Sequence, residues 1–245
     1  MQNTVQLSFV HHIHNIGKSN LFLAGIILFS AGSILSIFSG FNATMGILSL
    51  FLNAMPVIAL WLIFAASTRP MMPEKTLTAL TLFKITAVFM LFSAGLMIPT
   101  LVILFLETFL FTPYPIIGPP HVSTTYITLV AAYVAVSLLY YIPLLKILSN
   151  IRQSIIFNTI HPVHIVRLFT VSAVLMVIFR ISSSIFLATV GIYALMDNSA
   201  WFINSLMQGL LTATTLSIVS NLVISAGIII LVICLNKLSC LALDT

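Results

Sequence analysis

Arg180 is the side chain in this sequence whose position most strongly implies a chemical role. It lies near the middle of an apolar stretch, residues 168–195, about 20 Å of helical rise from either end. An arginine at the centre of a membrane helix costs at least about 2.5 kcal/mol on insertion scales, so it is expected to face a bundle interior and to have polar partners. There it could bind or gate an anion, or it could lock two helices together through hydrogen bonds.

Polar side chains that could meet Arg180 occur at helical spacing. Ser184 lies one turn further along the same helix face. The last apolar stretch, residues 201–235, carries two polar stripes. One stripe contains Asn204, Gln208, Thr212 and Thr215, and the other contains Thr214, Ser217, Asn221 and Ser225. We expect Arg180 to meet one of the two stripes, and the candidate binding residues are Arg180, Ser184, Gln208, Thr212 and Asn221.

Glu107 is the only carboxylate within an apolar stretch, and it lies near one end of residues 77–111. A proton-coupled transporter would use a carboxylate of this kind. In straight helices Glu107 would stand above Arg180, so an ion pair between them needs a kink, which Pro99 would supply. The alternative is a glutamate at the membrane surface that water solvates. Glu107 is therefore a further candidate binding residue.

The histidines form two short pairs, His11 with His14 and His161 with His164. Two such pairs could together supply ligands to zinc. The first pair, however, lies on a segment whose apolar residues suit a membrane surface, and Pro162 interrupts the second. The four histidines are therefore weak metal candidates, and we expect no metal and no cofactor.

Motifs of catalytic sites are absent from the sequence. It contains no G-x-S-x-G, no G-x-x-x-x-G-K-[ST] phosphate-binding loop and no H-E-x-x-H. It also lacks the pair of acidic residues on which metal-assisted phospholipid chemistry depends. We therefore expect that the protein is not an enzyme.

The composition identifies the surroundings of these residues. Of the 245 residues, 60% are hydrophobic and 5% are charged, and the mean hydropathy is +1.21. A soluble domain carries about 25% charged residues. This chain could not cover a water-facing surface, so its exterior is expected to contact the lipid bilayer. The formal charge of +5 does not indicate nucleic-acid binding, because the basic residues are dispersed around apolar stretches.

Six apolar stretches are long enough to cross a bilayer, which takes about 20 residues. They cover residues 20–40, 45–67, 77–111, 125–145, 168–195 and 201–235. A polar loop is expected at 68–75, and a longer connection with an apolar stripe is expected at 146–167. We predict an all-α integral membrane bundle of six transmembrane helices, with a cytoplasmic or interfacial segment at 1–19, one transmembrane domain at 20–237 and a cytoplasmic tail at 238–245.

The positions of Lys and Arg orient this bundle. Most basic residues precede the first stretch, follow the last one, or lie in alternate gaps: Lys18, Arg69, Lys75, Lys146, Arg152, Arg167 and Lys237. Cytoplasmic loops of membrane proteins are enriched in Lys and Arg. The pattern therefore predicts that both termini are cytoplasmic.

Small residues repeat along one face of the first stretch, at Gly25, Gly32, Ser36 and Gly40. Such a seam allows a neighbouring backbone to approach closely. We expect it to pack inside the bundle, with dimerisation as the alternative.

Two segments carry a resemblance. They are residues 19–24 (SNLFLA), and residues 55–67 (MPVIALWLIFAAS) followed through the polar loop by 80–84 (LTLFK). Over about the first 100 residues the chain resembles small multi-pass membrane proteins of Gram-positive gut bacteria, a group without known activity. The resemblance implies the plasma membrane of a bacterium as the location, and it implies no activity.

Two classes of function follow. The favoured one is a transporter-like protein or accessory permease component with a polar site around Arg180. The alternative is a non-catalytic scaffold or partner-binding subunit, in which Arg180 joins two helices. The partners expected are lipid and, in either class, another membrane subunit or a second copy of the chain; the substrate is not specified by the sequence.

Overall fold

The computed structural model describes residues 13–39, 46–68, 73–106, 120–157, 166–196 and 204–243. Within these ranges the chain is α-helical except for the turn at Lys18 and Ser19. A short helical turn at residues 13–17 leads into α2. The long helices are α2 (Asn20–Ser39), α3 (Gly46–Thr68), α4 (Pro73–Leu106), α5 (Pro120–Phe157), α6 (Val166–Met196) and α7 (Asn204–Leu243).

The predicted all-α membrane class is confirmed by the length and composition of these helices. Five of them contain stretches long and apolar enough to cross a membrane, and the described apolar part of α3, Ala54–Thr68, is shorter. The described part of each of the two longest predicted stretches lies in a single helix: α4 has 34 residues and α7 has 40. Many large apolar side chains on the outside of the bundle are exposed, such as Phe92 and Leu168, as lipid-facing residues are.

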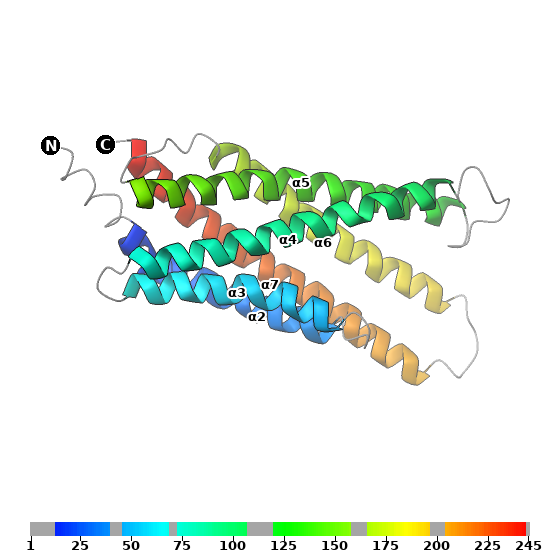
Figure 1. Cartoon of the computed structure of the whole chain (residues 1–245). Helices are drawn as coiled ribbons and strands as arrows, with labels where there is room; N and C mark the ends of the chain where they lie inside the picture. Colours follow the sequence, from blue (N-terminus) through cyan, green and yellow to red (C-terminus); the bar gives the residue numbers. More distant parts are fainter. Residues whose placement is uncertain are drawn as a thin grey trace.

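The helices form a closed ring in the order of the chain. Each helix packs against its neighbours in sequence, and α7 packs against α2, which is the most extensive of these contacts. Successive helices run in opposite directions, so α2, α4 and α6 begin at the end of the bundle where α3, α5 and α7 finish (Figure 1). The described basic residues at this end are exposed, and we call it the basic end; they are Lys18, Lys75, Lys146, Arg152, Arg167 and Lys237.

Two of the predicted connections between spans are partly helical. The prediction of a connection at 146–167 is wrong over residues 146–157, because α5 continues to Phe157. In this extension Ile147, Ile151 and Ile155 are buried while Lys146 and Arg152 are exposed, which is the pattern of an amphipathic helix. Because an exposed charge on one face does not stop a helix whose other face is buried, the apolar stripe determines the structure here.

The prediction of a polar loop at 68–75 is wrong over residues 73–75, because α4 begins at Pro73. Proline suits the first position of a helix, because the N–H that it lacks would have no hydrogen-bond partner within the helix. Glu74 in the first turn adds a favourable interaction with the helix dipole. Pro73 therefore starts the helix that it was expected to precede. The tail predicted from residue 238 is helical up to Leu243.

The glycine seam of α2 packs inside the bundle, against α7, at Gly25 and Gly32, and Gly40 lies outside the described residues. A Cβ atom on Gly32 would lie 2.8 Å from the backbone nitrogen of Ile224, and one on Gly227 would lie 2.7 Å from the backbone nitrogen of Phe29. Ser220 donates a hydrogen bond of 2.9 Å to the carbonyl of Gly32. The two backbones are in contact because neither glycine has a side chain to separate them.

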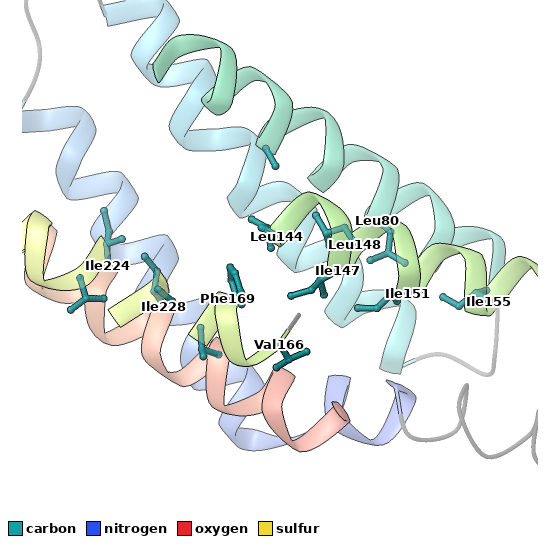
Figure 2. Close-up of a cluster of buried hydrophobic side chains, with 14 residues drawn as sticks. Leu80, Leu144, Ile147, Leu148, Ile151, Ile155, Val166, Phe169, Ile224 and Ile228 are labelled. Atoms are coloured by element: carbon teal, nitrogen blue, oxygen red, sulfur yellow. The ribbon is translucent and has the colours of Figure 1, made fainter. Parts of the chain in front are cut away.

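The main apolar core lies toward the basic end, between α4, α5, α6 and α7 (Figure 2). Leu80 comes from α4, Ile147 and Ile151 from α5, Phe169 from α6 and Ile228 from α7, and all are buried. These side chains hold the helices around the axis of the ring. They also form much of the wall of the cavity described below.

Candidate functional site

Arg180 lies deep in the bundle, on α6. It follows Val166, the first residue of α6, by 14 positions, which corresponds to about 21 Å of rise from the basic end. Its side chain is partly buried and faces the interior of the ring, where it lines a cavity. An arginine at this depth was the central expectation from the sequence, and its orientation toward the interior agrees with the cost of exposing it to lipid.

A closed set of hydrogen bonds fixes one side of the Arg180 guanidinium. Nη1 of Arg180 donates to Oδ1 of Asn221 over 3.3 Å. Nδ2 of Asn221 donates to Oγ of Ser184 over 2.7 Å, and that hydroxyl donates to the Arg180 carbonyl over 2.8 Å. Both ends of the Asn221 amide are therefore used, which holds it in one orientation. Asn221 in α7 thus positions a guanidinium of α6.

The rest of the guanidinium has spare hydrogen-bonding capacity. Arginine carries five N–H donors, and one of those on Nη1 is used by the bond to Asn221. Nε is buried and has no hydrogen-bond partner. Glu74 is the only acidic residue among the described ones, and it lies in the first turn of α4, at the basic end. Within the described part, no carboxylate therefore neutralises Arg180.

A cavity of about 220 Å³ runs along the axis of the ring and reaches Arg180. All six long helices line it. At the basic end it begins at the level of Ile16, Thr76 and Ile151, and at its deep end it is bounded by Met90 and Arg180. Arg180 is the only charged side chain in the described lining. The cavity therefore connects the level of the basic end with a single positive charge at mid-depth.

A few uncharged polar groups share the deep half of the cavity with Arg180. Tyr140 and Tyr141 of α5 both line it, and their rings meet edge to face with centroids 5.0 Å apart. Tyr140 also packs on Phe169 of α6, at a centroid distance of 5.2 Å. The hydroxyl of Thr86 is used by its own helix, donating to the Leu82 carbonyl over 2.9 Å. The tyrosines thus add polar hydroxyls to a wall that is otherwise mostly apolar.

The structure brings together three of the predicted site residues: Arg180, Ser184 and Asn221. Gln208 and Thr212 belong to α7, but their side chains lie outside the described residues. Their positions are 13 and 9 residues before Asn221, or about 20 and 13 Å of rise further from the basic end. Arg180 therefore meets the stripe that contains Asn221.

Of the remaining predicted candidates, the structure places only His14. Glu107, His11, His161 and His164 lie outside the described residues, and His14 belongs to the helical turn at 13–17. Among the described residues, no group of three or more His, Cys, Asp or Glu side chains could hold a metal ion.

The tyrosine pair was missed by sequence reasoning, although a signal was present. Tyr140 and Tyr141 are adjacent, polar and inside an apolar stretch, three and two residues before Pro143. Since tyrosines in membrane proteins are common at the membrane surface, only the helix extension to Phe157 shows that this pair lies deep in the bundle.

No protein-family model matches the chain, and neither a curated protein nor a solved structure is significantly similar to it. The case for a function rests on the geometry of the cavity and of Arg180.

Proposed function

We propose that this protein is a transporter-like membrane protein, or an accessory permease component, whose Arg180 binds an anionic substrate midway through the bundle. The observation that supports this proposal is a cavity that reaches a guanidinium with an unpaired, buried Nε. A group that only joined helices would be expected to have its donors filled by neighbouring side chains.

The physical argument for an anion is the cost of the charge itself. A buried donor without a partner costs about 1–3 kcal/mol, and a charged one costs more. An anion about 4 Å from the guanidinium gains about 4 kcal/mol at an effective dielectric constant of 20. Because the described lining contains no carboxylate, a bound anion is the group that would recover this energy.

The topology that we propose has six spans, with both termini and the basic end of the bundle in the cytoplasm of a bacterium. The clustering of exposed Lys and Arg at that end supports it. The cavity would then approach Arg180 from the cytoplasm, as the inward-facing state of a transporter does. The protein would reside in the plasma membrane.

Cysteine labelling of intact cells tests this topology. Single cysteines at Pro70, Gly118 and Asn198 would be introduced after Cys234 and Cys240 are replaced by serine. A membrane-impermeant maleimide added outside should label positions 118 and 198, and position 70 should react only after lysis. Protection of position 118 from the outside reagent would contradict the model.

Anion binding to the purified chain in lipid nanodiscs tests the function. The probes are sodium acetate, benzoate, chloride and phosphate, and the readout is the shift in thermal unfolding with anion concentration. We expect at least one anion to stabilise the wild type and Arg180→Gln to abolish that shift. Arg167→Gln is the matched control, because it removes an exposed arginine from the first turn of the same helix.

The second candidate is a scaffold or partner-binding subunit, and the hydrogen bonds that join α6 to α7 through Arg180 and Asn221 favour it. In this case Arg180→Gln should lower the unfolding temperature, while no anion shifts it in the wild type. A partner, either another membrane subunit or a second copy, should then be lost from the variant on co-purification. Neither candidate involves catalysis.

A further inference from the structure

The two ends of the cavity differ in polarity and charge. Toward the basic end its walls are mostly apolar, formed by side chains such as Leu80, Ile147 and Ile151. At the deep end it holds one cation, Arg180, together with the tyrosine pair. A small inorganic anion would use the deep end and leave the apolar walls without a partner. A ligand that matches the whole cavity has one anionic group and an apolar body.

The volume limits the size of that ligand. An engineered protein cavity of about 150 Å³ holds benzene, which has six carbon atoms. In proportion, the 220 Å³ here suits about nine non-hydrogen atoms. Along α5 the lining extends from Tyr140 to Ile151, which is about 16 Å of helical rise. A small volume spread over this length fits a single extended chain better than a compact ring system.

The free part of the guanidinium indicates the chemical type of the anionic group. Nη1 lies on the side of the guanidinium near Cδ, and it is bonded to Asn221. The opposite edge carries the N–H groups of Nε and Nη2 side by side, and Nε has no partner among the described residues. A planar carboxylate accepts two parallel hydrogen bonds from such an edge. Since no carboxylate among the described residues neutralises Arg180, its single positive charge further favours a monoanion.

We propose that the ligand is an amphipathic monocarboxylate of about nine or ten non-hydrogen atoms, such as a straight-chain acid of octanoate size. Its carboxylate binds the Nε–Nη2 edge of Arg180, and its chain lies along the apolar walls toward Ile151. Because Nε is buried, binding at this edge requires the guanidinium to rotate while Nη1 keeps its bond to Asn221. This inference rests on the proposed function, because it assigns a substrate class to the same site.

The test compares octanoate with acetate, which keeps only the carboxylate, and with octan-1-ol, which keeps only the chain. Sodium octanoate, sodium acetate and octan-1-ol are titrated calorimetrically into the full chain in nanodiscs, with empty nanodiscs subtracted. Octanoate should bind at least about tenfold more tightly than either of the other two, because a charge-assisted hydrogen bond and apolar burial each contribute at least that factor. Arg180→Gln should weaken octanoate binding at least about tenfold, and Arg180→Lys should lie between, since it keeps the charge without the two-donor edge.

A steric variant tests the position of the chain. Leu80→Trp narrows the apolar half of the cavity and should shift the preferred acid from octanoate to hexanoate or shorter. Leu96→Trp, at an exposed site of the same helix, should leave the preference unchanged. Thermal unfolding of each variant identifies any that fail to fold.

The outcomes separate this inference from the function on which it rests. If acetate binds as tightly as octanoate and Arg180→Gln abolishes both, the amphipathic ligand is refuted while the anion site stands. If octan-1-ol matches octanoate and Arg180→Gln changes nothing, both are refuted. An unchanged acid preference in folded Leu80→Trp would refute the placement of the chain along the apolar walls.

Discussion

The contact between α2 and α7 predicts a large effect of a small substitution, Gly227→Ala. The added Cβ atom would lie 2.7 Å from the backbone nitrogen and 3.0 Å from the Cα atom of Phe29, and 3.1 Å from the carbonyl oxygen of Gly25. All three atoms belong to the backbone, so no side-chain rotation relieves the overlap. To restore a contact of 3.4 Å from 2.7 Å, α2 and α7 must separate locally by 0.7 Å.

The size of the effect follows from a comparison with Gly95→Ala. A Cβ atom on Gly95, within α4, meets nothing within 4 Å. Both substitutions bring the same helix-propensity gain of about 1 kcal/mol. Only Gly227→Ala overpacks an interface, which costs about 1–3 kcal/mol. The free energy of unfolding of Gly227→Ala should therefore lie about 1–3 kcal/mol below that of Gly95→Ala.

Equilibrium unfolding in mixed micelles of a mild detergent and dodecyl sulfate measures this difference. Cys234 is buried and free, so its reaction with a thiol probe reports unfolding when Cys240 is replaced by serine. Equal stability of the two alanine variants would refute the close approach of α2 and α7.

Two further substitutions test single contacts in the same unfolding assay. Asn221→Ala removes the acceptor of Arg180 and the donor to Ser184. It should lower the free energy of unfolding by about 0.6–1.7 kcal/mol. It should also reduce the anion-dependent shift in thermal unfolding, because the guanidinium loses its orientation. A loss of stability with an undiminished anion response would show that Asn221 does not position Arg180. Ser220→Ala removes the hydrogen bond to the Gly32 carbonyl and should lower the free energy of unfolding by about 0.6 kcal/mol. It should leave anion binding unchanged. A changed anion response would contradict the inference that the α2–α7 contact is independent of the Arg180 site.

The features that the sequence predicted well are those that depend on one helix or on one costly residue. The apolar stretches gave the six helices to within a few residues at several ends, for instance 20–40 against Asn20–Ser39. Arg180 was expected to find polar partners because exposure to lipid is so unfavourable, and Asn221 is one of them. The close packing expected of the glycine seam is present at Gly32.

Other features could not be predicted because they depend on several helices at once. The charges of Lys146 and Arg152 placed these residues in a connection between two spans, whereas burial of Ile147 and Ile151 against other helices keeps them in α5. The cavity is a property of side chains from six helices, and its volume cannot be derived from any one stretch. The choice between the two stripes of α7 likewise depends on how far α6 and α7 are shifted along each other.

The contact of α2 with α7 has a consequence for the order in which the protein is made. The hydrogen bond from Ser220 to Gly32 joins residues 188 positions apart, so α2 leaves the ribosome long before α7, the helix against which it packs most extensively. Until then the glycine face of α2 is without α7, and Arg180 is already in the membrane without Asn221. Ribosomes add about 5–20 residues per second, so this unpaired state lasts for seconds during every round of synthesis, a period in which the insertion machinery or a chaperone would have to shield the arginine from lipid.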